Sequence, residues 1–573
     1  MRKKGAEELL KAEKGTVIKP RGGRTAVALV YPNTYYVGMS NLGLQAVYRL
    51  INGRKDALCE RVFLPPEEKA EKAEKAGTPP FSVETKTPVG EFEILAFSVS
   101  FENDYINVAT TLRLAGVPPF SAGRGDGFPL VILGGICTSF NPEPIAGFFD
   151  AVIVGEAEQV LPEFLDLYEL RKLELPRAEL LRELSKIPGV YVPSLYNPLY
   201  NQDMTLKSMA VSPGAPERIL RRHVADIDDN AAKSVIITPN TEFSDMFLVE
   251  LSRGCGRHCR FCMAGYVSRP PRSRSFESVA KDIREGMRLT KKIGLVGAAV
   301  SDYPYIAMLA DEFADAEINF SASSLRADSL TPELVRLVSK GNRTVAIAPE
   351  AGSERLRAVI NKNLTEEQIL RAVGSLIEGG VLNVKLYFMV GLPTEEDGDV
   401  DAIAALSMKA REAMLGAAKA RGRVGNLILS VNCFIPKPWT PFQWEPMEPV
   451  DRLLAKIRSI EKALKGVPNV SVIHDVPKWA YLQCALSRGD RRLAKVILAA
   501  SDNGGDWKAA FAAEGLDMDF YAGRVRGEDE RFPWEIIDTG IDRDYLRQEY
   551  ARAGRACHTP ACKVGTCKLC GVC

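Results

Sequence analysis

The chain has 573 residues, of which 46% are hydrophobic and 26% are charged, and its formal net charge is +1. This length exceeds what one hydrophobic core supports, so we expect about two to four domains. The small net charge argues against a general electrostatic attraction to nucleic acid or membranes. No window approaches the roughly 18 apolar residues of a membrane span, and the N-terminus lacks the apolar segment of a secretory signal. We therefore expect a cytoplasmic protein with no membrane partner.

Residues 1–170 alternate short apolar runs with helical patterns. "TAVALVYP", "EILAFSVSF", "PLVILGG" and "DAVIVGE" are the expected strands. Continuous β-branched runs separated by helices predict an α/β fold with a doubly wound, Rossmann-like parallel sheet. Ligands of such sheets lie outside the carboxyl ends of the strands. In this chain those ends are small, polar or Gly-rich, as a loop edge above a bound cofactor requires.

Three further parts follow along the chain. Residues 171–240 are a Pro-punctuated connector for which we expect a small sheet of its own. Residues 241–447 contain six strand-like runs, from "MFLVELS" to "LILSVNCFI", each followed by a helical pattern. Six such units predict a partial (β/α)6 barrel, whose chemistry belongs at the carboxyl ends of its strands. Residues 448–573 are predicted to be mostly helical and to end in a cysteine-rich tail.

Three cysteines lie together directly after the first predicted barrel strand. In "GCGRHCRFC" they are Cys255, Cys259 and Cys262. In a reducing cytoplasm, clustered cysteines indicate metal ligands rather than disulfides. Tetrahedral zinc takes four protein ligands, and so does a fully ligated cubane iron–sulfur cluster. Three thiolates would leave one iron of a cubane open, free to bind a small molecule through an amine and a carboxylate.

This stretch resembles the Cys-x3-Cys-x-aromatic-Cys signature of radical S-adenosylmethionine (SAM) enzymes, with Phe261 at the aromatic position. The resemblance implies a 4Fe–4S cluster that binds SAM and cleaves it reductively to a 5′-deoxyadenosyl radical. It also implies an external electron donor of the flavodoxin or ferredoxin type. Other residues also match the family's SAM-binding positions. For each of them the alternative interpretation is a strand-end turn or a helix cap. Those matches are Gly297 for the amino group, Ser323 and Arg326 for the carboxylate and ribose, Glu350 for the ribose, and Gly391 near adenine.

The N-terminal part resembles the cobalamin-binding domain of one class of radical SAM enzymes. The resemblance lies in "YPNTYYVGMSNLGLQ", "FSVSFEND", "VILGGICTSFNPEPI" and "VIVGEAE". The candidate cobalamin-binding residues are Asn41, Ser98, Ser100, Gly134, Gly135 and Glu156. No Asp-x-His-x-x-Gly motif is present and no histidine precedes His223, so bound cobalt would lack a protein imidazole, which suits methyl transfer. The alternative is a Rossmann scaffold without a cofactor.

Methylthiotransferases carry a related N-terminal domain that holds three cluster cysteines. This chain has only Cys59 and Cys137 in that region, so the comparison does not favour a methylthiotransferase. The domain order, "FPWEIIDTGIDRDYL" and the terminal "CGVC" instead resemble an uncharacterised family of cobalamin-binding-type radical SAM proteins. That resemblance covers nearly the entire chain and says nothing about a substrate.

Two other groups of residues call for explanation. The tail predicts a second iron–sulfur cluster or a zinc site, which would be either functional or a structural knot. Its cysteines are Cys557, Cys562, Cys567, Cys570 and Cys573. No acidic residue interrupts positions 251–274, which contain Arg253, Arg257, Arg260, Arg269, Arg272 and Arg274. These arginines would bind an anionic substrate such as RNA, or tune the first cluster. Aromatic residues for base stacking are sparse there, which favours tuning.

Together these features predict a radical SAM enzyme for cobalamin-dependent methylation of an unactivated carbon. The substrate would be a peptide, an RNA or a small molecule. One alternative keeps the radical without methylation and performs a rearrangement, cyclisation or redox step. The other is a non-enzymatic protein that binds RNA through a zinc tail and the arginines.

Overall fold

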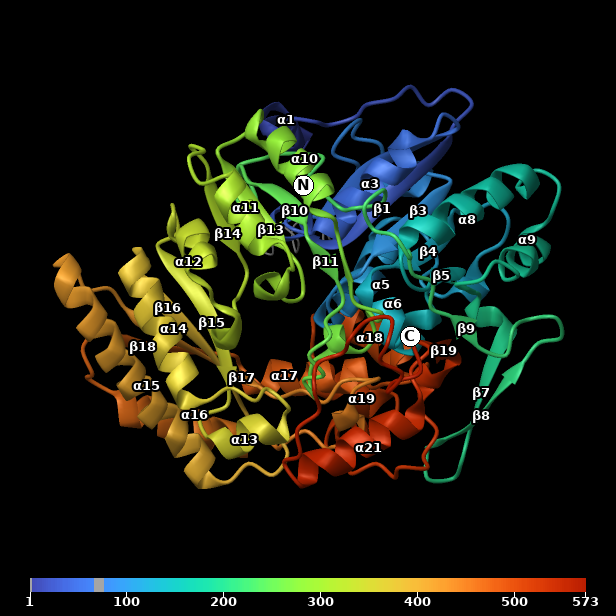
Figure 1. Cartoon of the computed structure of the whole chain (residues 1–573). Coiled ribbons are helices and arrows are strands. Elements are labelled where there is room, and N and C mark those ends of the chain that lie inside the picture. The colour runs from blue at the N-terminus through green and yellow to red at the C-terminus, as the bar shows by residue number, and fades with distance from the viewer. Residues whose placement is uncertain (1–2, 66–76, 573) are drawn as a thin grey trace.

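A six-stranded sheet forms the N-terminal part of the computed structural model, which describes residues 3–65 and 77–572 (Figure 1). Its order is β2-β1-β3-β4-β5-β6, with the first five strands parallel and β6 antiparallel to β5. The strands are β1 (Thr25–Thr34), β2 (Ala57–Leu64), β3 (Ile94–Ser98), β4 (Leu130–Gly134), β5 (Ala151–Ile153) and β6 (Val190–Tyr191). The predicted doubly wound α/β sheet is confirmed. Through β6, the connector contributes an edge strand to it.

The interior strand β1 separates two apolar cores. Val27 and Leu29 belong to the core that contains α3 (Leu42–Gly53) and α8 (Ala157–Arg171). Ala28 and Val30 belong to the core on the other face, with α5 (Tyr105–Leu114) and α18 (Leu493–Asp502). Successive side chains of a strand point to opposite faces, so a continuous apolar run fits a strand that is covered on both sides. One of the covering helices, α18, comes from the C-terminal region.

Seven parallel strands follow each other in sequence order in the second α/β part. They are β10 (Phe247–Glu250), β13 (Lys292–Val296), β14 (Asn319–Ala322), β15 (Thr344–Glu350), β16 (Asn383–Val390), β17 (Leu427–Cys433) and β18 (Val470–His474). The first three form one sheet and the last four another, and a single parallel bridge between Leu325 and Ile347 joins them. The first six strands are the six that the sequence predicts, and β18 extends the series.

Strand β16 shows why this part folds as layered strands and helices. Its side chains alternate between half-buried and buried along its whole length. The buried set includes Leu386 and Phe388, which lie in the same core as α14 (Glu366–Gly379) and α15 (Asp397–Ala418). Thr365 begins α14 with a capping box, because its hydroxyl accepts from Gln368 N at 3.2 Å while the Gln368 side chain accepts from Thr365 N at 2.9 Å. The helices therefore cover the face of β16 that carries its buried side chains.

The C-terminal region is mainly helical and joins the two sheets. It comprises α16 (Val450–Leu464), α17 (Pro477–Ser487), α18, α19 (Trp507–Ala513), α20 (Met518–Ala522) and α21 (Arg543–Gly554). Asn141, next to the first sheet, donates from Nδ2 to the carbonyls of Ser487 at 3.0 Å and Gly489 at 2.8 Å. Figure 1 shows these helices, in orange and red, beside both α/β parts. Among the helices of the two described ranges, none combines the length and the hydropathy that crossing a membrane requires.

A buried ion network holds β2 in place. The Arg61 guanidinium donates to Glu84 at 2.7 Å and to Glu13 at 2.8 Å, and all three side chains are at most 1% exposed. The guanidinium also lies 5.1 Å from the centre of the Tyr48 ring. Burial opposes the ionised form of Arg61, yet the two carboxylates raise its pKa well above the usual range. The charged residues of β2 therefore serve the interior of the fold.

Replacing Arg61 should destabilise this part of the protein strongly. Arg61→Met leaves two carboxylates buried without a cation, which costs about 3–5 kcal/mol of unfolding free energy. Urea unfolding followed by circular dichroism measures the loss. The matched control is Arg54→Met, because the Arg54 partners Asp56 and Asp166 are 46% and 67% exposed and such pairs contribute about 1 kcal/mol or less. Equal losses in the two variants would contradict the assignment.

Candidate active site

The three-cysteine loop lies at the carboxyl end of β10, the first barrel strand. It leaves from β11 (Ser252–Arg253) and returns at β12 (Arg272–Ser273), and these two short strands pair antiparallel. Gly254 begins the loop with a φ of +73°, and a Cβ there would lie 2.3 Å from the carbonyl oxygen of Ser268. Only glycine fits this turn without strain. The strand-end position matches the edge at which barrel chemistry occurs.

The three thiols lie close enough to influence one another electrically. Burial raises the pKa of Cys262 to about 12, with contributions from the thiolates of Cys259 and Cys255. Burial also raises the pKa of Cys255, and the Cys259 thiolate adds to this effect. In the described ranges, no three Cys, His, Asp or Glu side chains already surround one point as metal ligands do. Thiolates are the ligands that iron–sulfur clusters take in proteins, so the three cysteines of the loop fit that chemistry by their donor type.

A buried arginine between two of these cysteines joins the loop to the C-terminal region. Arg260 is fully buried and donates to the Glu549 carboxylate at 3.1 Å, to Val359 O at 2.8 Å and to Cys557 O at 2.6 Å. Glu549, on α21, is also fully buried. One side chain thus connects the cysteine loop with the segment after β15, with α21 and with the tail.

His258 and Asn361 complete this packing. His258 has a left-handed φ of 58° and is fully buried. Its Nδ1 lies 2.9 Å from Arg269 Nη2 and also contacts the Tyr545 hydroxyl. Burial, together with the charges of Arg269 and Arg260, lowers the pKa of His258 to about 3, so the ring is neutral near pH 7. Asn361 donates to the carbonyls of His258 at 3.1 Å and Thr559 at 3.0 Å.

The run of arginines around the loop is paired within the protein. Arg253 bonds Glu250, Glu156 and Glu158, Arg257 bonds Asp302, Arg260 bonds Glu549, Arg269 donates to Cys570 Sγ, Arg272 bonds Glu156, and Arg274 bonds Asp282. Apart from Glu250 and Asp282, the acids come from more distant parts of the chain, so most of the balance is not visible in the sequence around the loop. These guanidiniums organise the loop and do not form an unpaired cationic surface.

Two of the predicted SAM-binding residues lie next to the loop. Arg326 Nη1 is 3.9 Å from Cys259 Sγ. Glu350, at the end of β15, forms a 3.0 Å ion pair with Lys362, and their side chains are 14% and 7% exposed. Burial opposes charge on Lys362, but Glu350 and the Cys259 thiolate raise its pKa. Glu350 also has a φ of 72°, an unusual conformation for a non-glycine residue of the kind that clusters at functional sites.

The other predicted SAM-binding residues are Phe261, within the cysteine loop, and Gly297, Ser323 and Gly391, which directly follow β13, β14 and β16. Phe261 packs against the small apolar core that includes Phe434 and Phe442. A Cβ on Gly297 would lie 2.8 Å from Ser252 Oγ, and Gly391 has a φ of +82°. Ser323 is exposed just beyond β14 and makes no side-chain hydrogen bond in the described ranges. Sequence reasoning missed Lys362, since a lysine in "INKNLTEEQ" carries no motif.

The predicted cobalamin-binding residues lie at the carboxyl edge of the first sheet. Asn41 caps α3 and donates from Nδ2 to Ser100 Oγ at 3.0 Å. Ser98 and Gly134 end β3 and β4. Gly135 has a φ of +101°, and a Cβ there would lie 2.3 Å from Val99 O, so only glycine fits.

Glu156 connects this edge to the cysteine loop. Its carboxylate accepts from Arg253 at 2.9 Å, from Arg272 at 2.7 Å and from Val224 N at 2.8 Å. Burial opposes the ionised form, yet Arg272 and Arg253 hold the pKa of Glu156 below its usual value. A second junction lies at Glu102, which accepts from Lys437, after β17, and from Gln483 at 2.8 Å. The carboxyl edges of the two α/β parts therefore meet.

The cysteine tail packs against the loop that contains Cys255, Cys259 and Cys262. Cys562 N donates to Gly256 O at 2.7 Å, and Cys570 is buried with its Sγ 3.3 Å from Arg269 Nη1. Cys557 is exposed and Cys567 is half-buried, while Cys573 lies outside the described residues. The described tail thiols do not surround a common point. A metal in the tail therefore stays a prediction.

Comparison with known proteins decides the family. The model of the radical SAM superfamily matches residues 249–406, and the model described as "Radical SAM proteins, N-terminal" matches residues 43–193. "Uncharacterized protein MJ0966" of Methanocaldococcus jannaschii is 31% identical over 518 residues, which cover 89% of this chain and 98% of that protein. The chain belongs to the radical SAM superfamily. Its radical SAM domain implies SAM and a 4Fe–4S cluster as cofactors, and the cysteine loop fits that role.

The other matches cover only part of this chain. The tRNA-2-methylthio-N(6)-dimethylallyladenosine synthase of Parabacteroides distasonis is 24% identical over 168 residues, which are 26% of this chain and 36% of the synthase. The solved cobalamin-dependent S-adenosylmethionine radical enzyme OxsB with aqua-cobalamin bound is 15% identical, with a TM-score of 0.43. That match covers 67% of this chain and about half, 52%, of OxsB. A TM-score of 0.43 is too low to support an inference about a cofactor in this chain.

The Glu156 carboxylate should control the order of the cysteine loop. In Glu156→Gln, Arg272 loses its carboxylate partner, so amide hydrogen exchange in β11 and β12 should quicken by about tenfold or more. Hydrogen-exchange mass spectrometry measures this. The matched control is Glu158→Gln, because Arg253 then keeps Glu250 and Glu156. If both variants exchange alike, the two edges are not coupled through Glu156.

Proposed function

We propose that this protein cleaves SAM reductively and uses the resulting 5′-deoxyadenosyl radical to methylate an unactivated carbon with the help of cobalamin. The observation that carries the proposal is the loop of Cys255, Cys259 and Cys262 at the end of the first barrel strand, where three thiols neighbour one another. When bound there, a 4Fe–4S cluster supplies the single electron that breaks the sulfonium bond of SAM. That electron comes from an external donor of the flavodoxin or ferredoxin type.

The residues beside the loop would hold SAM. Arg326, whose Nη1 lies 3.9 Å from Cys259 Sγ, would bind the SAM carboxylate. Glu350 would accept hydrogen bonds from the ribose hydroxyls, and Lys362 pairs with its carboxylate at 3.0 Å. Phe261 anchors the loop in an apolar core. We assign Gly297, Ser323 and Gly391 to the remaining SAM contacts at the strand ends.

Cobalamin would lie on the carboxyl edge of the first sheet. Four exposed apolar side chains follow three neighbouring strands there: Tyr36 at 48%, Val37 at 40%, Phe101 at 44% and Ile136 at 38% exposure. We call these four the apolar rim. Together with the close backbone approach at Gly135, the apolar rim suits a large, flat macrocycle. Bound cobalamin would supply the methyl group, and the absence of histidine before His223 leaves its cobalt without a protein imidazole from this domain.

The proposed reaction requires the carboxyl edge of the first sheet and the carboxyl edge of the barrel to border the same space. The 5′-deoxyadenosyl radical would take a hydrogen atom from the substrate carbon and become 5′-deoxyadenosine. The resulting carbon radical would take the methyl group of cobalamin as a methyl radical, and one electron of the broken carbon–cobalt bond would stay on the cobalt. The contacts of Glu156 and Glu102 with the barrel side support this proximity. A substrate that is a peptide, an RNA or a small molecule would enter between the two edges.

Loss of one loop thiol should abolish SAM cleavage without unfolding the protein. We expect Cys255→Ala, reconstituted anaerobically with iron and sulfide, to form no 5′-deoxyadenosine from SAM and a strong reductant, because one of the three ligands is missing. Chromatography with mass spectrometry measures the product. The control is Cys433→Ala, which removes a buried thiol elsewhere in the barrel. Continued 5′-deoxyadenosine formation by Cys255→Ala would refute the cluster assignment.

Charge placed on the apolar rim should weaken cobalamin binding. Burying a Phe or Ile side chain contributes about 1.5–3 kcal/mol, so Phe101→Asp and Ile136→Asp should each raise the Kd about tenfold or more. Corrin absorbance after gel filtration measures the bound fraction. Leu173→Asp is the control, because Leu173 is 93% exposed and lies outside the apolar rim. A wild-type protein that forms 5′-deoxyadenosine but binds no corrin would favour the non-methylating alternative.

A further inference from the structure

Strand β18 is the last strand of its sheet, so only one of its two edges pairs with another strand, β17. At the paired edge, Leu427 N donates to Asn469 O at 2.8 Å and Asp475 N donates to Val431 O at 3.1 Å. Every second residue of a strand turns its backbone groups to the same side, so the intervening residues of β18 face the free edge. These free-edge residues are Val470, Val472 and His474. Within the part of the chain that the structure describes, their N–H and C=O groups have no hydrogen-bond partner.

Two other terminal strands, β10 and β2, are covered by neighbouring segments. For β10, Ser234 N donates to Leu248 O at 3.0 Å, and for β2, Val83 N donates to Arg61 O at 2.8 Å. Proteins usually cover an edge strand or protect it with proline, lysine or a bulge, because an open edge recruits another strand. Strand β18 has the sequence VSVIH and pairs with β17 without a bulge, so it carries none of these protections.

Exposed apolar side chains lie at the carboxyl end of this open edge. Ile473 is 47% exposed, Val476 is 53% exposed, and Trp479, in the first turn of α17, is 46% exposed. We call these three residues the edge trio. Val472 packs against the core that contains α16, so its neighbour Ile473 points to the opposite, inner face of the barrel strands. Recognition of an extended chain uses this combination, with main-chain hydrogen bonds for affinity and side-chain contacts for specificity.

The edge trio lies at the end of the barrel where the proposed reaction takes place. It follows the carboxyl end of β18, and Gln483, one turn after Trp479 on α17, donates to Glu102 at 2.8 Å. Residues four apart lie on the same face of a helix, so Trp479 shares the face of α17 that contacts the first sheet. Phe101 of the apolar rim directly precedes Glu102. A chain bound along β18 therefore extends toward the space between the two carboxyl edges.

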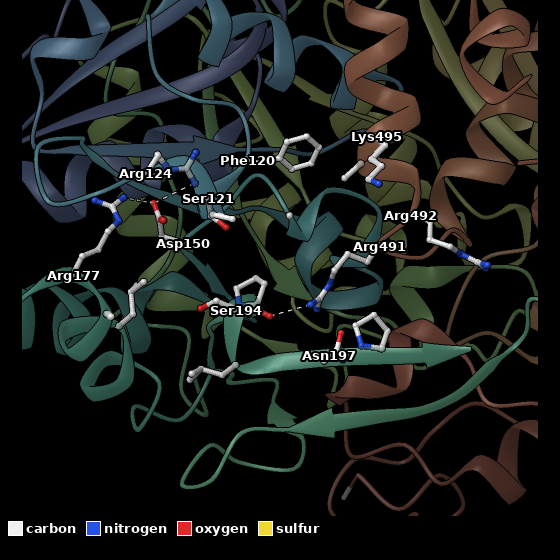
Figure 2. A pocket seen from close by; sticks show the side chains of 18 of the residues that line it. Phe120, Ser121, Arg124, Asp150, Arg177, Ser194, Asn197, Arg491, Arg492 and Lys495 are labelled. Carbon is white, nitrogen blue, oxygen red and sulfur yellow. Dashed lines mark hydrogen bonds and ion pairs between the residues drawn. The ribbon is translucent and has the colours of Figure 1, made fainter. Parts of the chain in front are cut away.

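A cavity of about 1080 Å³ lies at the other end of the first sheet, away from the proposed active site (Figure 2). Its lining includes Asp150, which directly precedes β5, whereas Glu156 follows that strand. The arginines of the lining are engaged within the protein, since Arg177 pairs with Asp150 at 2.7 Å and Arg491 pairs with Glu143 at 3.0 Å. We therefore place the substrate at the open edge of β18 and not in this cavity.

We propose that the substrate is a peptide and that its extended backbone binds to the free edge of β18 as an additional strand. This inference rests on the proposed function, because it names the substrate class of the same reaction. The row of alternating N–H and C=O groups matches the backbone of another extended chain, whereas RNA carries no such row. An apolar side chain of the bound peptide contacts the edge trio.

A second copy of this chain fits the edge less well than a peptide does. In a two-fold pair centred on Val472 the two strands run antiparallel, so Ile473 of one copy lies opposite Ser471 of the other. Val476 and Trp479 then lie beyond the paired residues and stay uncovered. A peptide that continues past the end of β18 covers them.

Binding of blocked hexapeptides to the full chain without cofactors tests the proposal. Affinity selection from a library of random sequence, followed by mass spectrometry, should recover a subset enriched in apolar residues. The best of these should bind at one site per chain by isothermal titration calorimetry. Its fully N-methylated form should bind at least about tenfold more weakly, because it has no backbone N–H to donate. Recovery of no hexapeptide, or equal binding of the N-methylated form, would overturn the proposal.

SAM cleavage is measured separately on the same protein, as 5′-deoxyadenosine formed after anaerobic reconstitution. A protein that forms 5′-deoxyadenosine but recovers no hexapeptide would overturn this inference and leave the proposed function standing. A protein that recovers hexapeptides but forms no 5′-deoxyadenosine would overturn the proposed function, and with it the role of the peptide as substrate.

A variant of the free edge locates the binding. Val472→Pro removes one N–H from the free edge and leaves the bonds to β17, so hexapeptide binding should weaken about tenfold or more. Val472→Thr is the matched control, because it keeps both the N–H and the branched shape. Thermal unfolding of both variants is measured in parallel. Equal binding by the two folded variants would show that the peptide does not pair with β18.

A second variant tests the edge trio. Trp479→Ala should weaken binding of the same hexapeptide about tenfold, because the contact with a large apolar side chain is lost. Leu289→Ala is its control, since Leu289 is 45% exposed and lies before β13, away from β18. Sedimentation equilibrium tests the second copy. A dimer that Val472→Pro dissociates, in a protein that recovers no hexapeptide, would assign the edge to self-association and overturn the proposal.

Discussion

The carboxylate of Glu156 is the contact on which the arrangement of this molecule most depends. Glu156 follows β5 of the first sheet, and its carboxylate accepts hydrogen bonds from Arg253 and Arg272, which lie at the two ends of the cysteine loop. This half-buried acid, together with Glu102, thereby connects the edge proposed for cobalamin with the edge proposed for SAM. Radical chemistry tolerates little displacement of its reacting atoms, since orientation alone accounts for large rate factors. The ion pairs supply that orientation before any substrate arrives.

The arginines around the cysteines show why charge cannot be interpreted from a local window. From residue 251 to 274 the chain contains no acid, and the stretch resembles a nucleic-acid-binding patch. In three dimensions its partners include Glu156, Asp302 and Glu549, which come from three distant parts of the chain. The pair of Arg260 and Glu549 is fully buried, and such a pair is costly to break because the remaining charge stays in the interior. Together these ion pairs hold the cysteine loop in place.

Much of the architecture follows from periodicity. Four strands of the first sheet and the first six of the barrel are visible as apolar runs, since strands covered on both faces carry continuous hydrophobic sequence. Strand β2 escapes that pattern because Glu60 and Arg61 interrupt it, and their burial depends on partners elsewhere in the fold. The same limit hides Lys362, whose pairing with Glu350 depends on how the segment after α13 (Glu354–Val359) turns back. Motif spacing finds the residues on the loop, but it does not find those that fold back onto it.

The contact of the tail with the cysteine loop also has a consequence for biosynthesis. Arg260 finds its carboxylate partner 289 residues later in the chain, and its further acceptor Cys557 O is later still. A ribosome therefore releases the three thiols long before it makes the segments that bury their neighbours. Throughout that interval the loop lacks the contacts of Arg260 with Glu549 and Cys557 that hold it in the folded protein.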